Sequence, residues 1–250
     1  MTPRYCALIP TYNNPLTVGK VVEQVRKHID AVIVVDDGSH ADGHAACRAL
    51  ASRGQARVIR LDSNCGKGAA VKQGLEVARE TGFSHAFQVD ADGQHNIDAI
   101  PAFLDASSRS PKSAIIGYPT YDASVPTIRY VGRRFTRLWV DLEVGSRSMI
   151  RDAMIGFRIY PIEPLLLLSI QSDRMEFDVE AVVKLAWAEI SIINLPVGVR
   201  YLTPAEGGIS HFDPLRDNLR MTRLHSRLCA RRATQWCLRR LQRGSASSTS

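Results

Sequence analysis

The stretch Phe87-Gln88-Val89-Asp90-Ala91-Asp92-Gly93-Gln94-His95 joins a short apolar run to two carboxylates one residue apart. The run predicts a strand, and both aspartates follow where it leaves the sheet. Because side chains at i and i+2 of an extended chain share one side, we expect Asp90 and Asp92 to converge. Paired carboxylates suit a hard divalent cation that shares its ligands with substrate phosphates. The alternative is a solvated turn, since Asp and Gly favour turns.

Apolar runs alternate with amphipathic segments on both sides of this stretch. Strands are predicted at 5–10, 31–37, 57–62, 85–90 and 113–117, and helices at 15–28, 41–53, 67–81 and 97–108. This alternation predicts an α/β fold, with a mostly parallel central sheet covered by helices on both faces. After residue 120 the pattern is less regular, with helices predicted at 127–145, 162–170 and 177–188 and a strand at 190–200.

Four of the predicted strands are followed by polar residues at their carboxyl ends, where ligands of such sheets bind. These ends are Pro10-Thr11-Tyr12-Asn13-Asn14, Asp36-Asp37-Gly38-Ser39, Asn64-Cys65-Gly66-Lys67-Gly68 and Asp90-Ala91-Asp92. Four polar edges on one rim indicate one binding site.

Two of these ends have a specific chemistry. Asp37 can accept hydrogen bonds from a nucleobase or ribose, or it can cap a helix or turn. The segment Gly66-Lys67-Gly68 opens a predicted helix, where glycine, the helix N-terminus and the lysine all favour a phosphate. Neither a Walker A loop nor a Gly-x-Gly-x-x-Gly dinucleotide fingerprint is present.

The four motifs, in this order, resemble family 2 glycosyltransferases of the GT-A fold, in the branch of the dolichyl-phosphate mannose synthases. The resemblance covers roughly residues 4–212. It implies inverting transfer from a nucleotide-diphospho-sugar, with Mg²⁺ or Mn²⁺ at the Asp-x-Asp motif. Asn14 stands where the family often has Glu, which leaves the choice of UDP or GDP open. The implied ligands are Pro10, Tyr12 and Asp37 for the nucleoside, Lys67 for the phosphates, Asp90 for ribose and metal, and Asp92 and Gln94 for the metal.

The resemblance also suggests a division of the chain. We expect residues 1–213 to form the GT-A domain, with a nucleotide-sugar-binding half at 1–120 and an acceptor half at 121–213. A basic helical segment is predicted at 214–243 and a disordered tail at 244–250.

An inverting transfer needs a base, unless the acceptor is already an anion. Asp152 lies in a segment that resembles the family's Asp-x-x-x-Gly-Phe-Arg motif, which faces the sugar. It is the first candidate for a base or acceptor orienter, and its alternative is a structural pair with Arg151 or Arg158. Glu180 is the second candidate, against an ordinary salt bridge.

Several arginines are candidates for binding the phosphate of the donor or of a lipid-linked or polyprenyl-phosphate acceptor. Arg129, Arg133 and Arg134 precede or begin a helical stretch, where a solvated helix face is the alternative. Arg200 and the segment 203–211 match the position of the family's mobile acceptor loop. The family often has lysine where this chain has His211.

The net charge of +7 is concentrated at the C-terminus. From Pro214 onward there are nine arginines and one acid, a charge of +8 that leaves about −1 for the rest of the chain. Arg216, Arg220, Arg223, Arg227 and Arg231 line one helical face, flanked by Met221, Leu224 and Leu228. This pattern predicts contact with an anionic membrane surface, and packing on the domain is the alternative. No nucleic-acid reader motif is present, so no nucleic-acid partner is expected.

The remaining composition favours a cytoplasmic protein at the inner face of a membrane. There is no apolar stretch of about 18 residues and no signal-peptide pattern, and the five cysteines show no Cys-x-x-Cys spacing. Two other functions stay open. A sugar-phosphate nucleotidyltransferase would need a Gly-rich loop with Arg and Lys after the first strand, and a non-catalytic nucleotide-sugar-binding module would not need intact acidic residues.

Overall fold

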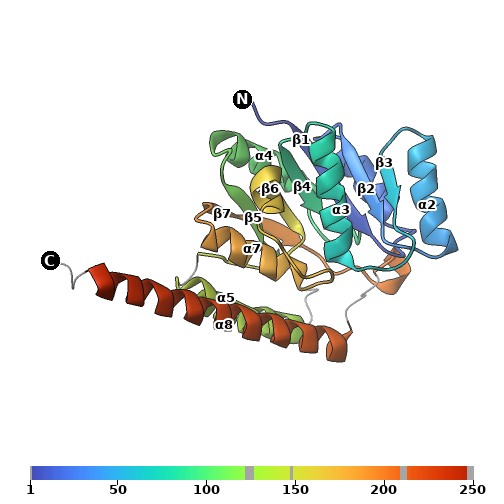
Figure 1. Ribbon diagram of the computed structural model, residues 1–250. Helices are drawn as coiled ribbons and strands as arrows, with labels where there is room; N and C mark the ends of the chain where they lie inside the picture. Colours follow the sequence, from blue (N-terminus) through green and yellow to red (C-terminus); the bar gives the residue numbers. More distant parts are fainter. Residues whose placement is uncertain (1, 122–126, 147–148, 209–212, 247–250) are drawn as a thin grey trace.

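The computed structural model describes residues 2–121, 127–146, 149–208 and 213–246, with the backbone alone at 127–131, 204, 214 and 235–246. The described residues form a seven-stranded sheet with the order β3-β2-β1-β4-β6-β5-β7 (Figure 1). The strands are β1 (Tyr5–Thr11), β2 (Val32–Asp36), β3 (Arg57–Arg60), β4 (His85–Val89), β5 (Ala114–Tyr121), β6 (Phe157–Pro161) and β7 (Ile192–Val199).

The prediction of a mostly parallel sheet is confirmed, with one exception. Strand β6 runs antiparallel to both of its neighbours, β4 and β5. The sequence analysis did not predict β6, because its five residues are all buried and include Arg158, which interrupts the apolar pattern. The antiparallel register pairs Val89 with Phe157, which brings the segment before β6 to the carboxyl end of β4.

Helices cover both faces of the sheet, as predicted (Figure 1). Alternate residues of β1 divide between two cores: Cys6 and Leu8 face one, and Ala7 and Ile9 face the other. The helices α1 (Val18–Val25), α2 (Ala41–Ser52) and α4 (Ile100–Arg109), with the short η1 (Ile97–Ala99), bury residues in the second core. The first core is shared by α3 (Lys67–Glu80), α6 (Ile162–Leu166) and α7 (Phe177–Trp187).

A further layer lies beneath α7. Helix α5 (Thr127–Val144) and the long helix α8 (Pro214–Ala246) run side by side there (Figure 1). Leu224 and Leu228 of α8 are buried in the first core, and His225 Nδ1 lies 2.7 Å from Glu143 Oε1 of α5. The C-terminal segment therefore packs on the domain. Among the described residues, no helix combines the length and the apolar character needed to cross a bilayer.

Several predicted boundaries were wrong, such as that of the helix predicted at 15–28, which spans Val18–Val25, and three of them have a clear structural cause. Helix α6 ends at Leu166 rather than at residue 170, and Ser169 adopts a positive φ of 49° that a helix cannot continue. Strand β5 runs to Tyr121 because it pairs along its whole length with β7. Helix α8 continues to Ala246, so residues 244–246, predicted to be disordered, are helical, and 247–250 lie outside the described residues.

The packing of α8 predicts different costs for two leucines of this helix. Leu224→Ala should lower the free energy of unfolding by about 2–5 kcal/mol, because it leaves a cavity in the core. Leu219→Ala, on the exposed face of the same helix, should change it by less than about 0.5 kcal/mol. Chemical denaturation measures both values. Equal losses would contradict the observed orientation of α8.

Candidate active site

The ends of β1 and β2 are joined by hydrogen bonds. The backbone N–H of Asn13 donates to Ser39 Oγ at 2.8 Å, and Asn13 Oδ1 accepts from the backbone N–H of His40 at 2.7 Å. The ring of Tyr12 lies edge-on to the ring of His40, with the centroids 5.9 Å apart. Pro10 is buried inside β1, and Tyr12 is half-buried on the rim. The nucleoside contacts expected of Pro10 and Tyr12 stay predictions.

Asp37 joins the end of β2 to the glycine loop. Its two carboxylate oxygens each accept a hydrogen bond of 2.8 Å, one from the backbone N–H of Cys65 and one from that of Gly66. Burial raises the pKa of Asp37, and these two hydrogen bonds counteract the rise. Asp37 is thus an anchor of the loop, and its contact with a nucleoside stays a prediction.

The glycine loop needs a glycine at residue 66. Its φ of 110° is rarely adopted by other residues, and a Cβ there would lie 2.4 Å from the carbonyl oxygen of Asp173. The loop then turns directly into α3, whose first residue is Lys67.

Lys67 joins the glycine loop to the end of β4. Its Nζ lies 2.7 Å from Asp90 Oδ1 and 2.7 Å from Asp178 Oδ2, an aspartate of α7. Contacts from Asn13 through Asp37 to Lys67 therefore connect all four predicted polar ends. The prediction that these ends share one rim is confirmed.

This cluster carries excess negative charge. Burial raises the pKa of Asp90; Lys67 lowers it, while Asp178 and Asp92 raise it further. Burial lowers the pKa of Lys67, but the charges of Asp178 and Asp90 outweigh it and raise that pKa overall. Asp90 and Asp178 share the ammonium of Lys67, and Asp92 adds a further negative charge that acts on Asp90, so an added cation would relieve the repulsion among these carboxylates.

The two residues of the Asp-x-Asp motif do not lie on an extended chain, as the sequence analysis assumed. Residues 91 and 92 form a turn, and Gly93 has a φ of 74°. Asp92 Oδ1 accepts the backbone N–H of Gln94 at 3.0 Å, a local bond typical of aspartate in turns. The backbone at Asp92 therefore forms the turn that was the alternative prediction. The carboxylate of Asp92 is nevertheless close enough for its charge to raise the pKa of Asp90.

Strand β6 brings the Asp152–Gly156 segment against Asp90. The backbone N–H of Asp90 donates to the carbonyl of Gly156 at 3.0 Å. A Cβ on Gly156 would lie about 2.0 Å from Asp90 Oδ1, so only glycine leaves room for this carboxylate. The antiparallel pairing explains why two motifs more than 60 residues apart belong to one site.

Asp152 is fully engaged. Its Oδ1 accepts the backbone N–H groups of Met154 and Ile155, both at 2.8 Å, and its Oδ2 lies 2.6 Å from Arg133 NH1. The predicted structural alternative is correct in kind, although the partner is Arg133 rather than Arg151 or Arg158. Arg134 is exposed, and the side chain of Arg129 lies outside the described residues.

The structure contradicts the prediction of Glu180 as a second candidate base. Glu180 is fully buried, two residues beyond Asp178 on α7 and so on a different face of the helix. Its oxygens accept from the backbone and hydroxyl of Ser172 and from the side chains of Lys184 and Arg227. The contact with Arg227 joins α7 to α8. Burial by itself would raise the pKa of Glu180, but hydrogen bonds from Lys184, Ser172 and the backbone of Gln171 lower it overall.

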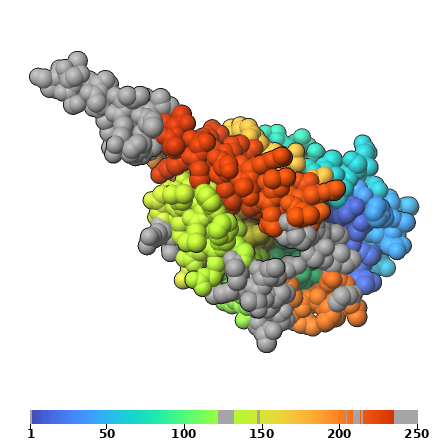
Figure 2. All heavy atoms as spheres, turned by 90° about the horizontal axis from the view of Figure 1, so that it is seen from below, coloured from blue at the N-terminus to red at the C-terminus, as the bar shows by residue number. Residues whose placement is uncertain are grey.

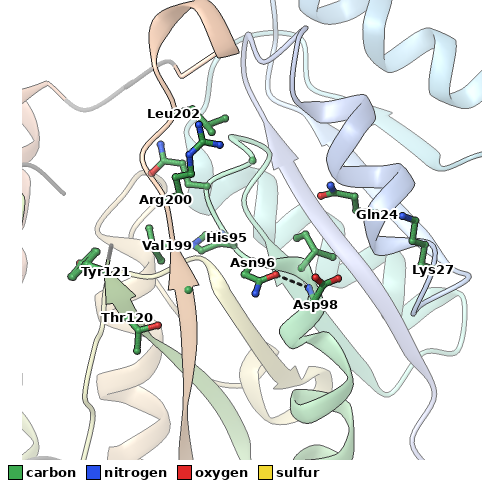
Figure 3. A pocket seen from close by; sticks show the side chains of 14 residues that line it. Gln24, Lys27, His95, Asn96, Asp98, Thr120, Tyr121, Val199, Arg200 and Leu202 are labelled. Atoms are coloured by element: carbon green, nitrogen blue, oxygen red, sulfur yellow. Dashed lines mark hydrogen bonds between the residues drawn. The ribbon is translucent and has the colours of Figure 1, made fainter. Parts of the chain in front are cut away.

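Arg200 and Gln94 lie on the wall of a separate cavity of about 660 Å³ (Figure 3). The backbone N–H of Arg200 donates to the carbonyl of Gln94 at 3.0 Å, and its guanidinium pairs with Glu206. Lys67, Asp90 and Asp152 are not part of this lining. Contacts of Arg200 with an acceptor and of Gln94 with a metal stay predictions, and His211 lies outside the described residues.

Sequence reasoning missed three buried polar residues of the site: Gln88, Arg158 and Asp178. Gln88 Nε2 donates to Asp178 Oδ1 at 3.1 Å, and Arg158 NH1 donates to the carbonyl of Asp178 at 3.0 Å. The sequence did contain a signal for these residues. Each of them is a charged or amide residue within an otherwise largely apolar strand or helix, namely β4, β6 and α7.

A family model, glycosyl transferase family 2, matches residues 6–163 of the chain. The chain belongs to glycosyl transferase family 2. The glycosyltransferase predicted from the motifs is confirmed, as are the GT-A fold and a nucleotide-sugar donor. The nucleotidyltransferase and non-catalytic alternatives are therefore wrong.

Curated relatives span most of this glycosyltransferase. The polyprenol monophosphomannose synthase of Mycolicibacterium smegmatis is 30% identical over 227 residues, covering 84% of this chain and 81% of that protein. The undecaprenyl-phosphate mannosyltransferase of Micrococcus luteus is 27% identical over 211 residues, covering 78% and 82%.

The fold is similar to that of glucosyl-3-phosphoglycerate synthase from Mycobacterium tuberculosis, solved with Mn²⁺, UDP and glucosyl-3-phosphoglycerate. The TM-score is 0.66 at 16% identity, over 92% of this chain and 80% of that chain. At this identity the likeness extends to the fold alone.

The close contact at Gly156 predicts a strong effect of a single methyl group. Gly156→Ala should displace the Asp90 carboxylate and destabilise the glycosyltransferase by about 1–3 kcal/mol, the usual cost of overpacking. Gly132→Ala, in α5 with nothing within 4 Å, should instead stabilise it by about 0.5–1 kcal/mol. Thermal melting compares the two variants. A Gly156→Ala protein as stable as the unmodified one would contradict the contact.

Proposed function

We propose that this glycosyltransferase performs a metal-dependent, inverting transfer of a sugar from a nucleotide-diphospho-sugar to a polyprenyl-phosphate acceptor. The observation that carries the proposal is the cluster at the end of β4. Asp90 and Asp178 hold a single lysine there, Lys67, which is the first residue of α3, and the charge of Asp92 acts on Asp90. A helix N-terminus and a lysine favour the diphosphate, and excess carboxylate favours a cation that neutralises it.

The residues present fit Mg²⁺ or Mn²⁺. Both ions take oxygen ligands, and Asp90, Asp92 and the amide of Gln94 offer oxygens in one segment. Among the residues that the structure describes, no three His, Cys, Asp or Glu side chains form a ready metal site. A cation that arrives with the donor would complete its ligands with diphosphate oxygens and water. When bound, it would neutralise charge on the leaving diphosphate.

We assign the acceptor phosphate to Arg133. Its guanidinium is largely buried and held by Asp152, which fixes its direction. A guanidinium can bind phosphate oxygens in pairs, and an acceptor that arrives as an anion needs no general base. Asp152 then acts as the orienter rather than the base. The similarity to an undecaprenyl-phosphate mannosyltransferase and to a polyprenol monophosphomannose synthase supports this class of acceptor.

We further propose that the protein associates with the inner face of a membrane through α5 and α8. The apolar strip predicted to serve this purpose is not available, because Leu224 and Leu228 are buried and Met221 packs on the same core. Instead, Phe135, Leu138 and Leu142 are exposed along one face of α5, and Leu215 and Leu219 are exposed on α8.

These two helices share one face of the molecule (Figure 2). Arg216, Arg223 and Arg231 are exposed on the same α8 whose buried side packs against the core. Exposed apolar side chains beside arginines suit an interface that holds both acyl chains and anionic headgroups. Such a surface would bring the acceptor phosphate toward Arg133, which belongs to α5.

The metal proposal predicts that Asp92→Ala abolishes sugar transfer while the protein stays folded. The reason is that removal of one carboxylate leaves too few ligands for the cation. Asp105→Ala, an exposed aspartate of α4, is the matched control and should retain activity. The measurement is release of nucleoside diphosphate from a panel of nucleotide sugars, with Mg²⁺, Mn²⁺ or EDTA. Full turnover by Asp92→Ala, or in EDTA, would exclude the metal.

The membrane proposal predicts sedimentation with anionic lipid vesicles at low salt and release at high salt, since salt screens charges beyond about 10 Å at 0.1 M. Leu138→Glu should weaken vesicle binding by about tenfold or more, given about 1.5–3 kcal/mol for burying a leucine. Leu167→Glu, at another strongly exposed leucine, which follows α6, is the control. Equal binding by both variants would reject the α5 surface.

A further inference from the structure

The ammonium of Lys67 is held between two carboxylates that differ in their surroundings. Asp90 follows β4 at the rim and keeps 22% of its side chain exposed, whereas Asp178 of α7 keeps 2%. Only Asp90 belongs to the Asp-x-Asp motif. The two aspartates therefore have different access to a donor, although each lies 2.7 Å from Lys67 Nζ.

Asp178 is fixed from several directions. Its Oδ1 accepts from Gln88 Nε2 at 3.1 Å, and its backbone carbonyl accepts from Arg158 NH1 at 3.0 Å. Burial by itself would raise the pKa of Asp178, but the charges of Lys67 and Arg158 lower it overall. Arg158 is itself fully buried and bonded to the carbonyl of Ile155. This carboxylate stays charged and in one position.

Asp90 faces a competing demand when a donor binds. A divalent cation on its oxygens would repel the lysine ammonium, so the attraction between Lys67 and Asp90 would weaken. Without a second counter-charge, the flexible lysine side chain would turn away from the diphosphate that it must contact. Asp178 supplies that counter-charge from the opposite side, out of reach of the solvent.

We infer that Asp178 is a positioning residue, which holds Lys67 on the donor diphosphate once Asp90 binds the metal. The inference rests on the proposed function, in which a cation and a nucleoside diphosphate meet at Asp90. It assigns a role to the Gln88 and Arg158 side chains as well, since both hold Asp178. Because Asp178 keeps only 2% of its side chain exposed, this role is exerted through Lys67 and requires no contact with the donor.

The test is the affinity for UDP and GDP in the presence of Mn²⁺, measured by calorimetry. Asp178→Asn keeps the shape of the side chain and removes its charge. It should weaken binding of the preferred nucleotide roughly tenfold, which corresponds to a coupling energy in the middle of the range for residues in contact. Lys67→Met should weaken it at least as much. The double variant should bind no more weakly than Lys67→Met, because Asp178 acts only through the lysine.

Glu180→Gln is the matched control for structural damage. It removes a buried carboxylate of the same helix, also paired with a lysine, Lys184. It should lower the melting temperature but leave the nucleotide affinity within about twofold of the unmodified protein, the scatter expected for uncoupled sites. If Asp178→Asn does not fold, Gln88→Met removes the hydrogen bond that fixes Asp178 and should weaken nucleotide binding in the same direction.

The outcomes separate the two ideas. If the unmodified protein binds neither UDP nor GDP with Mn²⁺, the proposed function fails and the inference fails with it. If it binds one of them and Asp178→Asn, or Gln88→Met in its place, binds equally well, the positioning role alone is overturned. Additive losses in the double variant would also overturn it, since they would show that Asp178 acts independently of Lys67.

Discussion

The site depends on one buried interaction, the ammonium of Lys67 between the carboxylates of Asp90 and Asp178. It joins the start of α3, the end of β4 and the start of α7, three segments far apart in the sequence. Charges with so little exposure are costly unless they are paired, so loss of one partner from this group would be strongly destabilising. The same arrangement leaves the rim with more negative than positive charge, which a cation bound with the donor would neutralise.

The antiparallel strand β6 is the second constraint on the site. In a purely parallel sheet, the segment before β6 would lie at the opposite edge, remote from the carboxyl end of β4. The reversal brings Gly156 against Asp90 and places Asp152, with its partner Arg133, beside the same rim. The donor side and the proposed acceptor side of the site are therefore connected through one short strand, whose own Arg158 is fully buried.

The C-terminal helix shows how one element serves two purposes. Its apolar stripe is used for packing, with Leu224 and Leu228 in the core and His225 paired with Glu143. The described arginine side chains of α8 are partly or fully exposed to solvent. One of them, Arg227, also contacts the buried Glu180. An amphipathic pattern indicates that a helix has two faces, but it does not identify what each face contacts. Here the apolar stripe of α8 packs on the protein core, and the exposed leucines lie elsewhere, at Leu138 and Leu142 of α5 and at Leu215 and Leu219 near the start of α8.

The sequence by itself determined the alternation of strands and helices, the rim of four polar ends and the family, because short-range periodicity and local motifs encode them. It identified Lys67, Asp90, Asp92 and Asp152 for the same reason. Only the tertiary structure decided that Asp178 rather than Glu180 faces Lys67, that Arg133 is the partner of Asp152, and that Asp37 holds the glycine loop. Each of these contacts joins segments at least 19 residues apart. Helical spacing shows that Asp178 and Glu180 point differently, but the direction of the site depends on how α7 packs against β4 and α3. That packing is a long-range property, which no local pattern contains.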